Sequence, residues 1–294
     1  MNEKSYCSEL AFSAAAPQFG TAVQVDVWLL VEYNRAWRPK ALLDNELDEP
    51  VRDHLNLLPA DLSKLHGLRL RVQFIKSKTR DAKKIFVAHA HAQLQQIFAG
   101  ELDSYEALLA IDAAEIMQPQ NLTKSDEPLY LVCTNGQRDL CCAKFGMPLY
   151  EVLSQHAPQQ VWQTTHIGGH RYAPNLVSLP SGLVYGFVQP EIAQSLVDAH
   201  NSGHMDISRL RGRSFLSPLA QAAEYYLRTH LELSDINALK FLTESSTEHG
   251  ATVSFDHAGQ KYQVALTQSV GEPVIASCEG KPKPVVEYTL NQIN

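Results

Sequence analysis

The chain has 294 residues, of which 45% are hydrophobic and 19% are charged, and its formal net charge is −7. This length allows one large core or two smaller ones, and the acids are not offset by any basic block that would neutralise a phosphate backbone. Nucleic acid is therefore excluded as a partner. The absence of 18 consecutive apolar residues, and of an apolar run at the start, predicts a cytoplasmic protein that does not enter membranes.

The first hundred residues predict a small mixed domain with the order strand, helix, strand, strand. The expected strands are rich in β-branched and aromatic residues, and the expected helix has apolar residues at helical spacing. Two further segments, 92–98 and 105–109, have short helical or mixed character. The strands are expected at 23–33, 68–75 and 84–90, and the helix at 50–65.

The second half predicts strand, helix, strand and then a hairpin, which is the order of a thioredoxin-like half sheet. The apolar run 129–133 reads as a buried strand, and a turn at 134–139 leads into a helix. A strand at 161–165 and a hairpin turned at Ser181–Gly182 follow. Helices are then expected at 190–200 and 218–230, and three half-exposed antiparallel strands at 251–256, 261–269 and 285–293.

The expected fold class is therefore α+β or α/β, with three parts. Residues 1–120 form a related or smaller mixed α/β domain, because the polar, proline-flanked segment 118–128 marks a boundary. Residues 121–235 form the thioredoxin-like domain. Residues 236–294 form a C-terminal antiparallel β appendage.

Two motifs about twenty residues apart gather thiols and imidazoles in a chain with only five cysteines. The first runs from Cys133 through Arg138 to Cys142, and the second, His166-Ile-Gly-Gly-His170, follows the next expected strand. Four soft or borderline donors are what a tetrahedral metal ion or a two-iron cluster requires. An odd, low cysteine count indicates a reducing compartment, in which nearby cysteines more often bind metal or do redox chemistry than form disulfides.

These motifs resemble those of the sucrase/ferredoxin-like family, whose core is similar to thioredoxin-like [2Fe-2S] ferredoxins. The matching pattern is Cys133-x-x-Gly-x-Arg-Asp-x-x-Cys142, followed by His166-x-Gly-Gly-His170-Arg-Tyr-Ala-x-Asn175, and the region near Gly20 also resembles the family. The resemblance implies a [2Fe-2S] cluster bound by Cys133, Cys142, His166 and His170. Cys141 departs from the minimal pattern and is the alternative ligand.

Several neighbours of these four residues are expected to support the cluster. Gly168 and Gly169 tolerate close backbone approach. Arg138 either tunes the potential or braces the loop with Asp139, which can also cap the next helix. Arg171 faces either a redox partner or solvent. Two imidazoles in place of two thiolates lower the negative charge, as in Rieske centres, and make the potential pH-dependent.

Three functions stay open from the sequence. The first is an electron carrier, rather than a stand-alone enzyme, that passes one electron between an unknown reductase and an unknown acceptor. The second is a structural zinc module of Cys2His2 type whose function is partner binding. The third is a thiol redox enzyme that uses Cys141 or Cys142.

Overall fold

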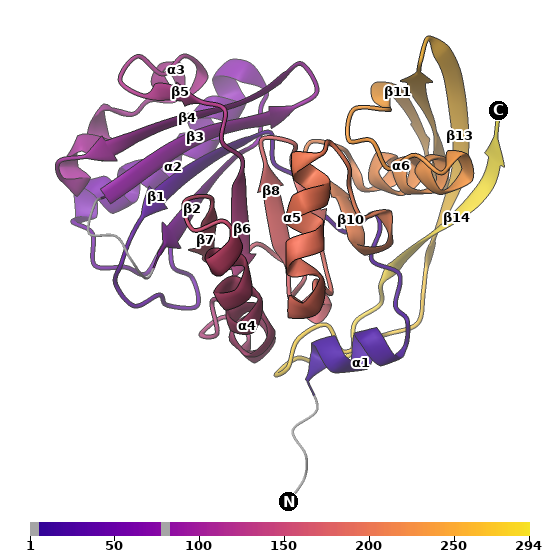
Figure 1. The fold of residues 1–294 in the computed structure, drawn as a ribbon, viewed down its shortest axis with the longest axis horizontal. Coiled ribbons are helices and arrows are strands. Elements are labelled where there is room, and N and C mark those ends of the chain that lie inside the picture. The colour runs from indigo at the N-terminus through magenta and orange to yellow at the C-terminus, as the bar shows by residue number, and fades with distance from the viewer. Residues whose placement is uncertain (1–5, 78–82) are drawn as a thin grey trace, which may run out of the picture.

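The computed structural model describes residues 6–77 and 83–294, and within them the strands form two separate sheets (Figure 1). The large sheet has ten strands in the order β10-β9-β8-β6-β7-β2-β1-β3-β4-β5. Its strands are β1 (Val27–Glu32), β2 (Leu70–Lys76), β3 (Lys83–His91), β4 (Leu94–Leu102), β5 (Thr123–Ser125), β6 (Leu129–Cys133), β7 (Val161–Thr164), β8 (Leu176–Leu179), β9 (Leu183–Tyr185) and β10 (Leu210–Arg213). The helices are α1 (Cys7–Ser13), α2 (Glu49–His66), α3 (Ala113–Met117), α4 (Leu140–His156), α5 (Ala193–Asn201) and α6 (Pro218–Leu231).

The large sheet consists of two units with the same topology. In the first, β1 and β2 are parallel and joined by α2, while β3 and β4 add antiparallel strands beside β1. In the second, β6 and β7 are parallel and joined by α4, while β8 and β9 add antiparallel strands beside β6. The orders β2-β1-β3-β4 and β7-β6-β8-β9 are therefore equivalent, and the expected thioredoxin-like class is confirmed with a related unit preceding it.

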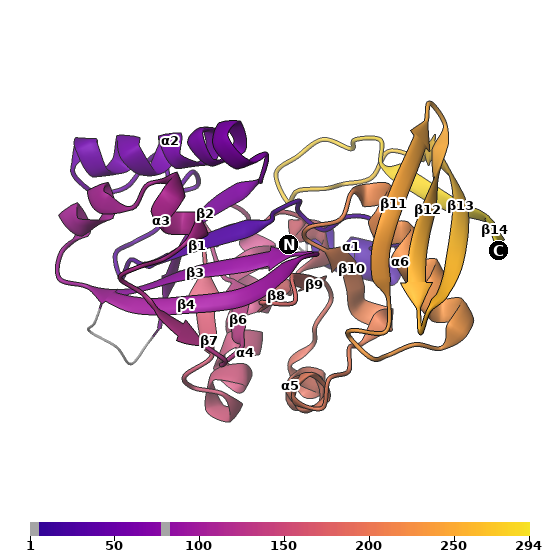
Figure 2. The same ribbon diagram turned by 90° about the horizontal axis from the view of Figure 1, so that it is seen from above.

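The two units join edge to edge, with their helices on opposite faces of the sheet. Strands β2 and β7 pair antiparallel through only two residue pairs, Ile75 with Thr164 and Lys76 with Gln163. Helices α2 and α3 cover one face, whereas α4 and α5 lie on the other (Figure 2). Within the described residues, each unit thus leaves one face without a helix.

The helix-free faces of the two units share one hydrophobic core. Alternation along β1 sends Leu29 towards α2 and Trp28 into this shared core. Strand β6 alternates in the same way and sends Cys133 into it. The rings of Phe86 and Trp162, one from each unit, meet edge to face with centroids 5.5 Å apart. The shared core fixes the position of Cys133 relative to both units.

The C-terminal sheet packs on α6. Its strands are β11 (Lys240–Thr247), β12 (Gly250–His257), β13 (Gln260–Val270) and β14 (Val286–Ile293). Buried residues of α6, such as Leu227, share a core with Val253 and Val264 of this sheet. The chain therefore makes four antiparallel strands here, where three were predicted.

Strands β4, β5, β10 and β11 were not predicted, and β4 and β11 were missed for the same reason. Segment 92–98 was expected to be helical or mixed, but it lies largely within β4, which pairs with β3 along nine residue pairs from Lys83 to His91. Strand β11 was missed because its residues are polar and mostly exposed. In both cases pairing with a neighbouring strand decides the conformation, which local pattern does not reveal. The division into three domains, with its two boundaries, stays a prediction.

The described helices include none that is both long enough and apolar enough to cross a membrane. Residues 1–5, part of the start that was judged to lack an apolar run, lie outside the described chain.

Candidate metal centre

The site lies where the parallel strands β6 and β7 end. Cys133 is the last residue of β6 and pairs in register with Thr164 of β7, while His166 follows β7 by two residues. Cys142 lies in the first turn of α4, the helix that joins the two strands. Parallel strands end at one edge of a sheet, so the connection between them brings all three side chains together.

Three of the four predicted ligands lie within mutual reach. The Nδ1 atom of His166 is 3.6 Å from the Sγ atom of Cys142 and 3.9 Å from the Sγ atom of Cys133. The three donor atoms lie within 4.8 Å of one another. Both cysteines are buried and His166 is partly exposed. This group could hold a metal ion.

His170 lies beside this group on a 3₁₀ turn (His170–Tyr172) and keeps one nitrogen unused. Its ring centroid is 5.0 Å from that of His166. Its Nδ1 atom is buried, and no described residue forms a hydrogen bond with it. Its Nε2 atom is 3.7 Å from Oδ2 of Asp139. A carboxylate behind one ring nitrogen orients the other as a metal ligand, so Nδ1 is the donor that fits.

The protonation states of His170 and Cys133 favour metal binding, whereas Cys142 must release a proton to bind a metal. Burial lowers the pKa of His170 below its ordinary value, although Asp139 opposes this shift, so the ring is neutral near pH 7. A hydrogen bond from Cys142 holds the pKa of Cys133 well below that of a free thiol, and His166 adds to this effect against burial. The same hydrogen bond, together with burial, raises the pKa of Cys142. The two sulfurs thus share one thiolate charge.

Asp139 organises the start of α4. It is the N-cap of the helix, and its Oδ1 accepts a hydrogen bond of 2.9 Å from the backbone N–H of Cys141. Its Oδ2 accepts hydrogen bonds of 3.1 Å from the Ser277 hydroxyl and from the backbone N–H of Cys278. Burial opposes ionisation, but the backbone donors hold the pKa of Asp139 below its ordinary value. The carboxylate therefore joins α4, His170 and the C-terminal segment.

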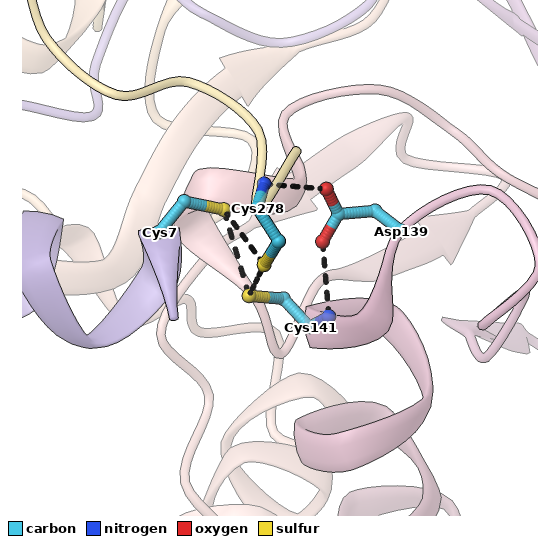
Figure 3. A group of neighbouring side chains, drawn as sticks. All are labelled: Cys7, Asp139, Cys141 and Cys278. Atoms are coloured by element: carbon cyan, nitrogen blue, oxygen red, sulfur yellow. Dashed lines mark hydrogen bonds between the residues drawn. The ribbon is translucent and has the colours of Figure 1, made fainter. Parts of the chain in front are cut away.

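Cys141 and Cys142 point to different places. The Sγ of Cys141 lies 3.5 Å from that of Cys7 and 3.1 Å from that of Cys278 (Figure 3). Cys141 is therefore not part of the group that contains His166. Consecutive helical residues differ by about 100° in direction, so only one of the two neighbours can face Cys133. The structure brings Cys142 to His166, and Cys141 to a second group of thiols.

The glycines between the two histidines are required by backbone conformation and by one close approach. Gly168 and Gly169 have φ angles of +96° and +72°, a region that side chains disfavour. A Cβ atom on Gly169 would lie 2.3 Å from a guanidinium nitrogen of Arg211, whereas one on Gly168 would meet nothing within 4 Å. The close approach is thus made by an arginine.

Arg211 is an important residue that the sequence did not single out. It is 2% exposed, and its guanidinium donates to the carbonyl of Gly168 at 3.1 Å and to Oδ1 of Asn175 at 2.8 Å. Asn175 in turn donates to the carbonyl of Gly169 at 2.9 Å and so braces the loop. Burial lowers the pKa of Arg211 to about 10. No sequence signal marks it, since it lies about forty residues downstream on β10.

The first unit also holds the site, through residues that were missed. Arg71 and Gln73 of β2 donate hydrogen bonds of 2.7 Å and 3.3 Å to the carbonyl oxygen of His166. Thr165 adds a backbone hydrogen bond of 3.0 Å to the carbonyl of Phe74. The sequence signal that could have revealed them is the presence of the polar residues Arg71 and Gln73 within a buried strand. The N-terminal unit therefore positions the backbone of a candidate ligand.

Of the two arginines in the motifs, Arg171 does not lie where it was expected. Arg138 is exposed. Burial is the main cause that lowers the pKa of His170, and the positive charge of Arg138 adds a small effect in the same direction. Arg171 was expected to face a partner or solvent, and this is wrong. It is 8% exposed and lies over the ring of Tyr172, 4.5 Å from the ring centroid, because the 3₁₀ turn directs it inward.

The fold and this site define a class: a thioredoxin-like protein with a cysteine and histidine group that suits a soft or borderline metal. Residues 18–212 match the sucrase/ferredoxin-like family. The chain belongs to that family.

Known relatives share only part of the chain. Altered inheritance of mitochondria protein 32 of Meyerozyma guilliermondii is 37% identical over 82 residues, and its counterpart in Debaryomyces hansenii is 35% identical over 80 residues. Each match covers 24% of this chain and 29% of the relative, so less than a third of either relative is represented. The thioredoxin-like [2Fe-2S] ferredoxin from Aquifex aeolicus is 22% identical, with a TM-score of 0.25 over 29% of this chain and 90% of the ferredoxin.

Proposed function

We propose that this protein is a one-electron carrier with a [2Fe-2S] cluster bound by Cys133, Cys142, His166 and His170. The observation that carries the proposal is that the donor atoms of Cys133, Cys142 and His166 lie within 4.8 Å of one another where β6 and β7 end. His170 lies beside them, and its buried Nδ1 has no hydrogen-bond partner among the described residues. A set of two sulfurs and two imidazole nitrogens suits such a cluster. Membership of the sucrase/ferredoxin-like family supports it.

The cluster would supply reversible one-electron transfer. The residues around it control charge and protons. Cys133 and Cys142 contribute negative charge from within the shared core, and His170 stays neutral with its Nε2 directed at Asp139. A ligating imidazole keeps a second nitrogen that can hold a proton, so proton binding at this nitrogen and electron uptake are linked. The potential should therefore fall as pH rises.

The partners we propose are a reductase and an acceptor protein. His166 and His170 are partly exposed while both cysteines are buried, so a partner can approach the site from the histidine side. A pocket of about 310 Å³ adjoins His166 and is lined by Arg71, Gln73 and Asn135, among others. We keep the cytoplasmic location as a prediction.

Iron and sulfide analysis of anaerobically purified protein tests the proposal. We expect about two iron and two sulfide per chain and a red-brown colour. Cys142→Ser should lose most of the iron, whereas Cys141→Ser, which alters the adjacent thiol, should keep it. Equal iron loss in both variants, or a colourless wild-type protein, would contradict the proposal.

A single zinc ion is the second candidate for this site. The observation in its favour is that the donor atoms of Cys133, Cys142 and His166 all lie within 4.8 Å, which suits one ion. A colourless protein with one zinc at this site would establish it. Thiol catalysis is disfavoured, because Cys141 and Cys142 are both 0% exposed, whereas a catalytic cysteine is usually a partly exposed thiolate.

A further inference from the structure

The three cysteines outside the candidate centre meet at a second place. Cys7 begins α1, Cys141 lies in the first turn of α4, and Cys278 belongs to the segment between β13 and β14. Their sulfurs are 3.5 Å apart for Cys7 and Cys141, 3.1 Å for Cys141 and Cys278, and 3.7 Å for Cys7 and Cys278. Figure 3 shows the three thiols pointing toward one another. Segments from both ends of the chain thus converge on the start of α4.

These distances fit a single metal ion. Tetrahedral zinc with bonds of about 2.3 Å to sulfur separates its sulfur ligands by about 3.8 Å. A disulfide requires about 2.05 Å and pairs two sulfurs, which leaves the third unexplained. In a cluster with several irons, sulfurs on different irons lie farther apart than sulfurs on one. Three mutual separations of 3.1 to 3.7 Å therefore indicate one shared ion.

Asp139 offers a fourth donor. A carboxylate oxygen of Asp139 and the three sulfurs all lie within 4.8 Å of one another. The carboxylate is already held by the hydroxyl of Ser277 and the backbone N–H of Cys278, so it needs little rearrangement to face an ion. Three sulfurs and one oxygen complete a tetrahedral set.

The surrounding segments have little regular structure of their own. Helix α1 has seven residues, too few for a stable isolated helix. The segment from 271 to 285 contains no helix or strand, and its backbone makes an isolated bridge between Val274 and Lys283 and a turn that begins at Ser277. The apolar cluster around the thiols is small, with Cys7, Cys141 and Ala173 as its buried members. A metal is a common way to fix such segments when a core is too small.

We propose that Cys7, Cys141 and Cys278 bind one Zn²⁺ ion as thiolates, with Asp139 as the fourth donor, and that this ion clamps both chain ends to α4. Each thiol releases its proton to solvent when its sulfur binds, and no electron is transferred. The site is separate from the candidate centre at Cys133, Cys142, His166 and His170. Both sites nevertheless use residues at the N-terminus of α4, since Asp139 and Cys141 lie there beside Cys142.

Metal analysis in a background without the first site tests this proposal. The full chain with Cys133→Ser and Cys142→Ser should retain about one zinc per chain and, after exchange, give the visible spectrum of tetrahedral thiolate-bound Co²⁺. Adding Cys7→Ser or Cys278→Ser should lower the zinc content at least about tenfold. Adding Ala276→Ser, a small change in the same segment, should leave it unchanged. Because iron is not measured, the result does not depend on the proposed cluster.

A second measurement covers the case in which the background variant does not fold. Wild-type protein should contain about one zinc in addition to any iron, and Cys278, the partly exposed thiol of the three, should resist alkylation until a chelator removes the zinc. The proposal is overturned if folded protein exposed to Zn²⁺ holds none at these residues. It is equally overturned if mass spectrometry finds a Cys141–Cys278 disulfide in place of the metal.

Discussion

At the scale of single residues, two adjacent cysteines lead to different sites. The sequence pattern correctly gives the strand ends at which Cys133 and His166 lie, because buried strands are marked by apolar runs. It does not decide between Cys141 and Cys142, since that depends on where α4 begins. Asp139 sets this start as N-cap. The partners of Cys141 lie 134 and 137 residues away in sequence, a separation over which no local pattern can act.

Removing the charge of Asp139 should weaken metal binding at His170. Asn caps a helix about as well as Asp, so Asp139→Asn removes the carboxylate while it keeps α4 capped. Loss of a carboxylate behind a ligating histidine costs about 10- to 100-fold in metal affinity. Iron retention during chelator challenge measures this effect. Asp112→Asn, at the N-cap of α3, is the matched control, and equal retention in the two variants would refute the role of Asp139.

His200 should make the protein less stable in mild acid. Hydrogen-bonding distances of 2.7 Å to Tyr185 and 3.1 Å to Ser178 surround the ring, and burial lowers its pKa from 6.5 to about 4. Below pH 6.5 His200 binds a proton in the unfolded chain but not in the folded protein. The free energy of unfolding therefore falls between pH 6.5 and about 4. The loss is at most about 3 kcal/mol.

Urea unfolding of His200→Gln at several pH values checks this. Gln can bond both neighbours without titrating, so the difference between wild type and variant should change by up to about 3 kcal/mol between pH 7 and pH 4. A difference that stays constant with pH would show that His200 is not the group responsible.

At the scale of elements, the loop from His166 to Asn175 is held by strands on both sides. Arg211 of β10 and Asn175 bind its glycine carbonyls, while Arg71 of β2 binds the carbonyl of His166. The sequence predicts the strands and the hairpin around this loop but not these long-range arginines. It also misses β4 and β11, whose conformation is set by the strands beside them.

Gly169→Ala should displace His170. An alanine at this position would have to adopt a φ of +72°, which side chains disfavour, and its methyl group would meet the Arg211 guanidinium. We expect a loss of about 1 to 3 kcal/mol in stability together with reduced iron content. Gly259→Ala has φ of +84° with open space around it, and it controls for backbone strain alone. If both variants keep full iron content, the close approach of Arg211 to Gly169 does not support the site.

At the scale of the whole molecule, two units of the same topology share one core and contribute different residues to the candidate site. The second unit supplies all four candidate ligands, and the first supplies Arg71 and Gln73 as supports for the backbone of His166. The sequence anticipates the class of both units, because strand and helix periodicities survive in each. Their edge-to-edge joining through β2 and β7 rests on two residue pairs and leaves no periodic signal.

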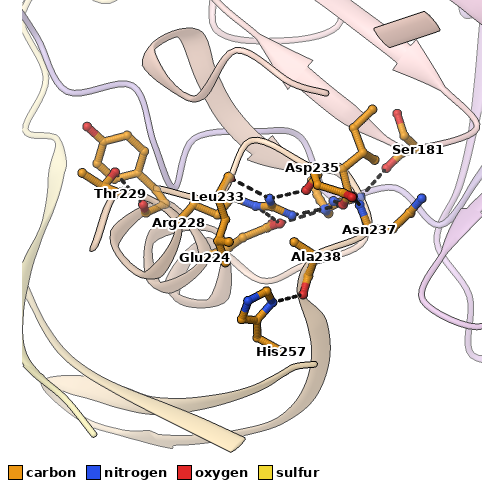
Figure 4. A network of polar contacts seen from close by, with 12 residues as sticks. Ser181, Glu224, Arg228, Thr229, Leu233, Asp235, Asn237, Ala238 and His257 are labelled. Carbon is orange, nitrogen blue, oxygen red and sulfur yellow. Dashed lines mark hydrogen bonds and ion pairs between the residues drawn. The ribbon is translucent and has the colours of Figure 1, made fainter. Parts of the chain in front are cut away.

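The joint to the C-terminal sheet depends on a buried group of charges. Glu224 of α6 accepts hydrogen bonds of 2.9 Å from both Arg213 and Arg228. Arg228 also donates to the carbonyls of Leu233 and Asp235 (Figure 4). Burial opposes the charge of Glu224, but the two arginines outweigh it and lower its pKa.

Glu224→Gln should therefore destabilise this joint strongly. It leaves two buried arginines without their anion, which costs about 3 to 5 kcal/mol. Glu232→Gln, at the exposed end of the same helix, should change stability by less than about 0.5 kcal/mol. Thermal unfolding followed by circular dichroism measures both, and similar unfolding temperatures for the two variants would contradict the role of the buried charges.

Electron paramagnetic resonance of the dithionite-reduced protein, purified without oxygen, tests the central claim most directly. A two-iron cluster with thiolate and imidazole ligands predicts a paramagnetic signal in the reduced state, and His166→Cys should alter its spectrum because a ligand atom changes. A protein that gives no signal and contains zinc at Cys133, Cys142 and His166 would contradict the claim.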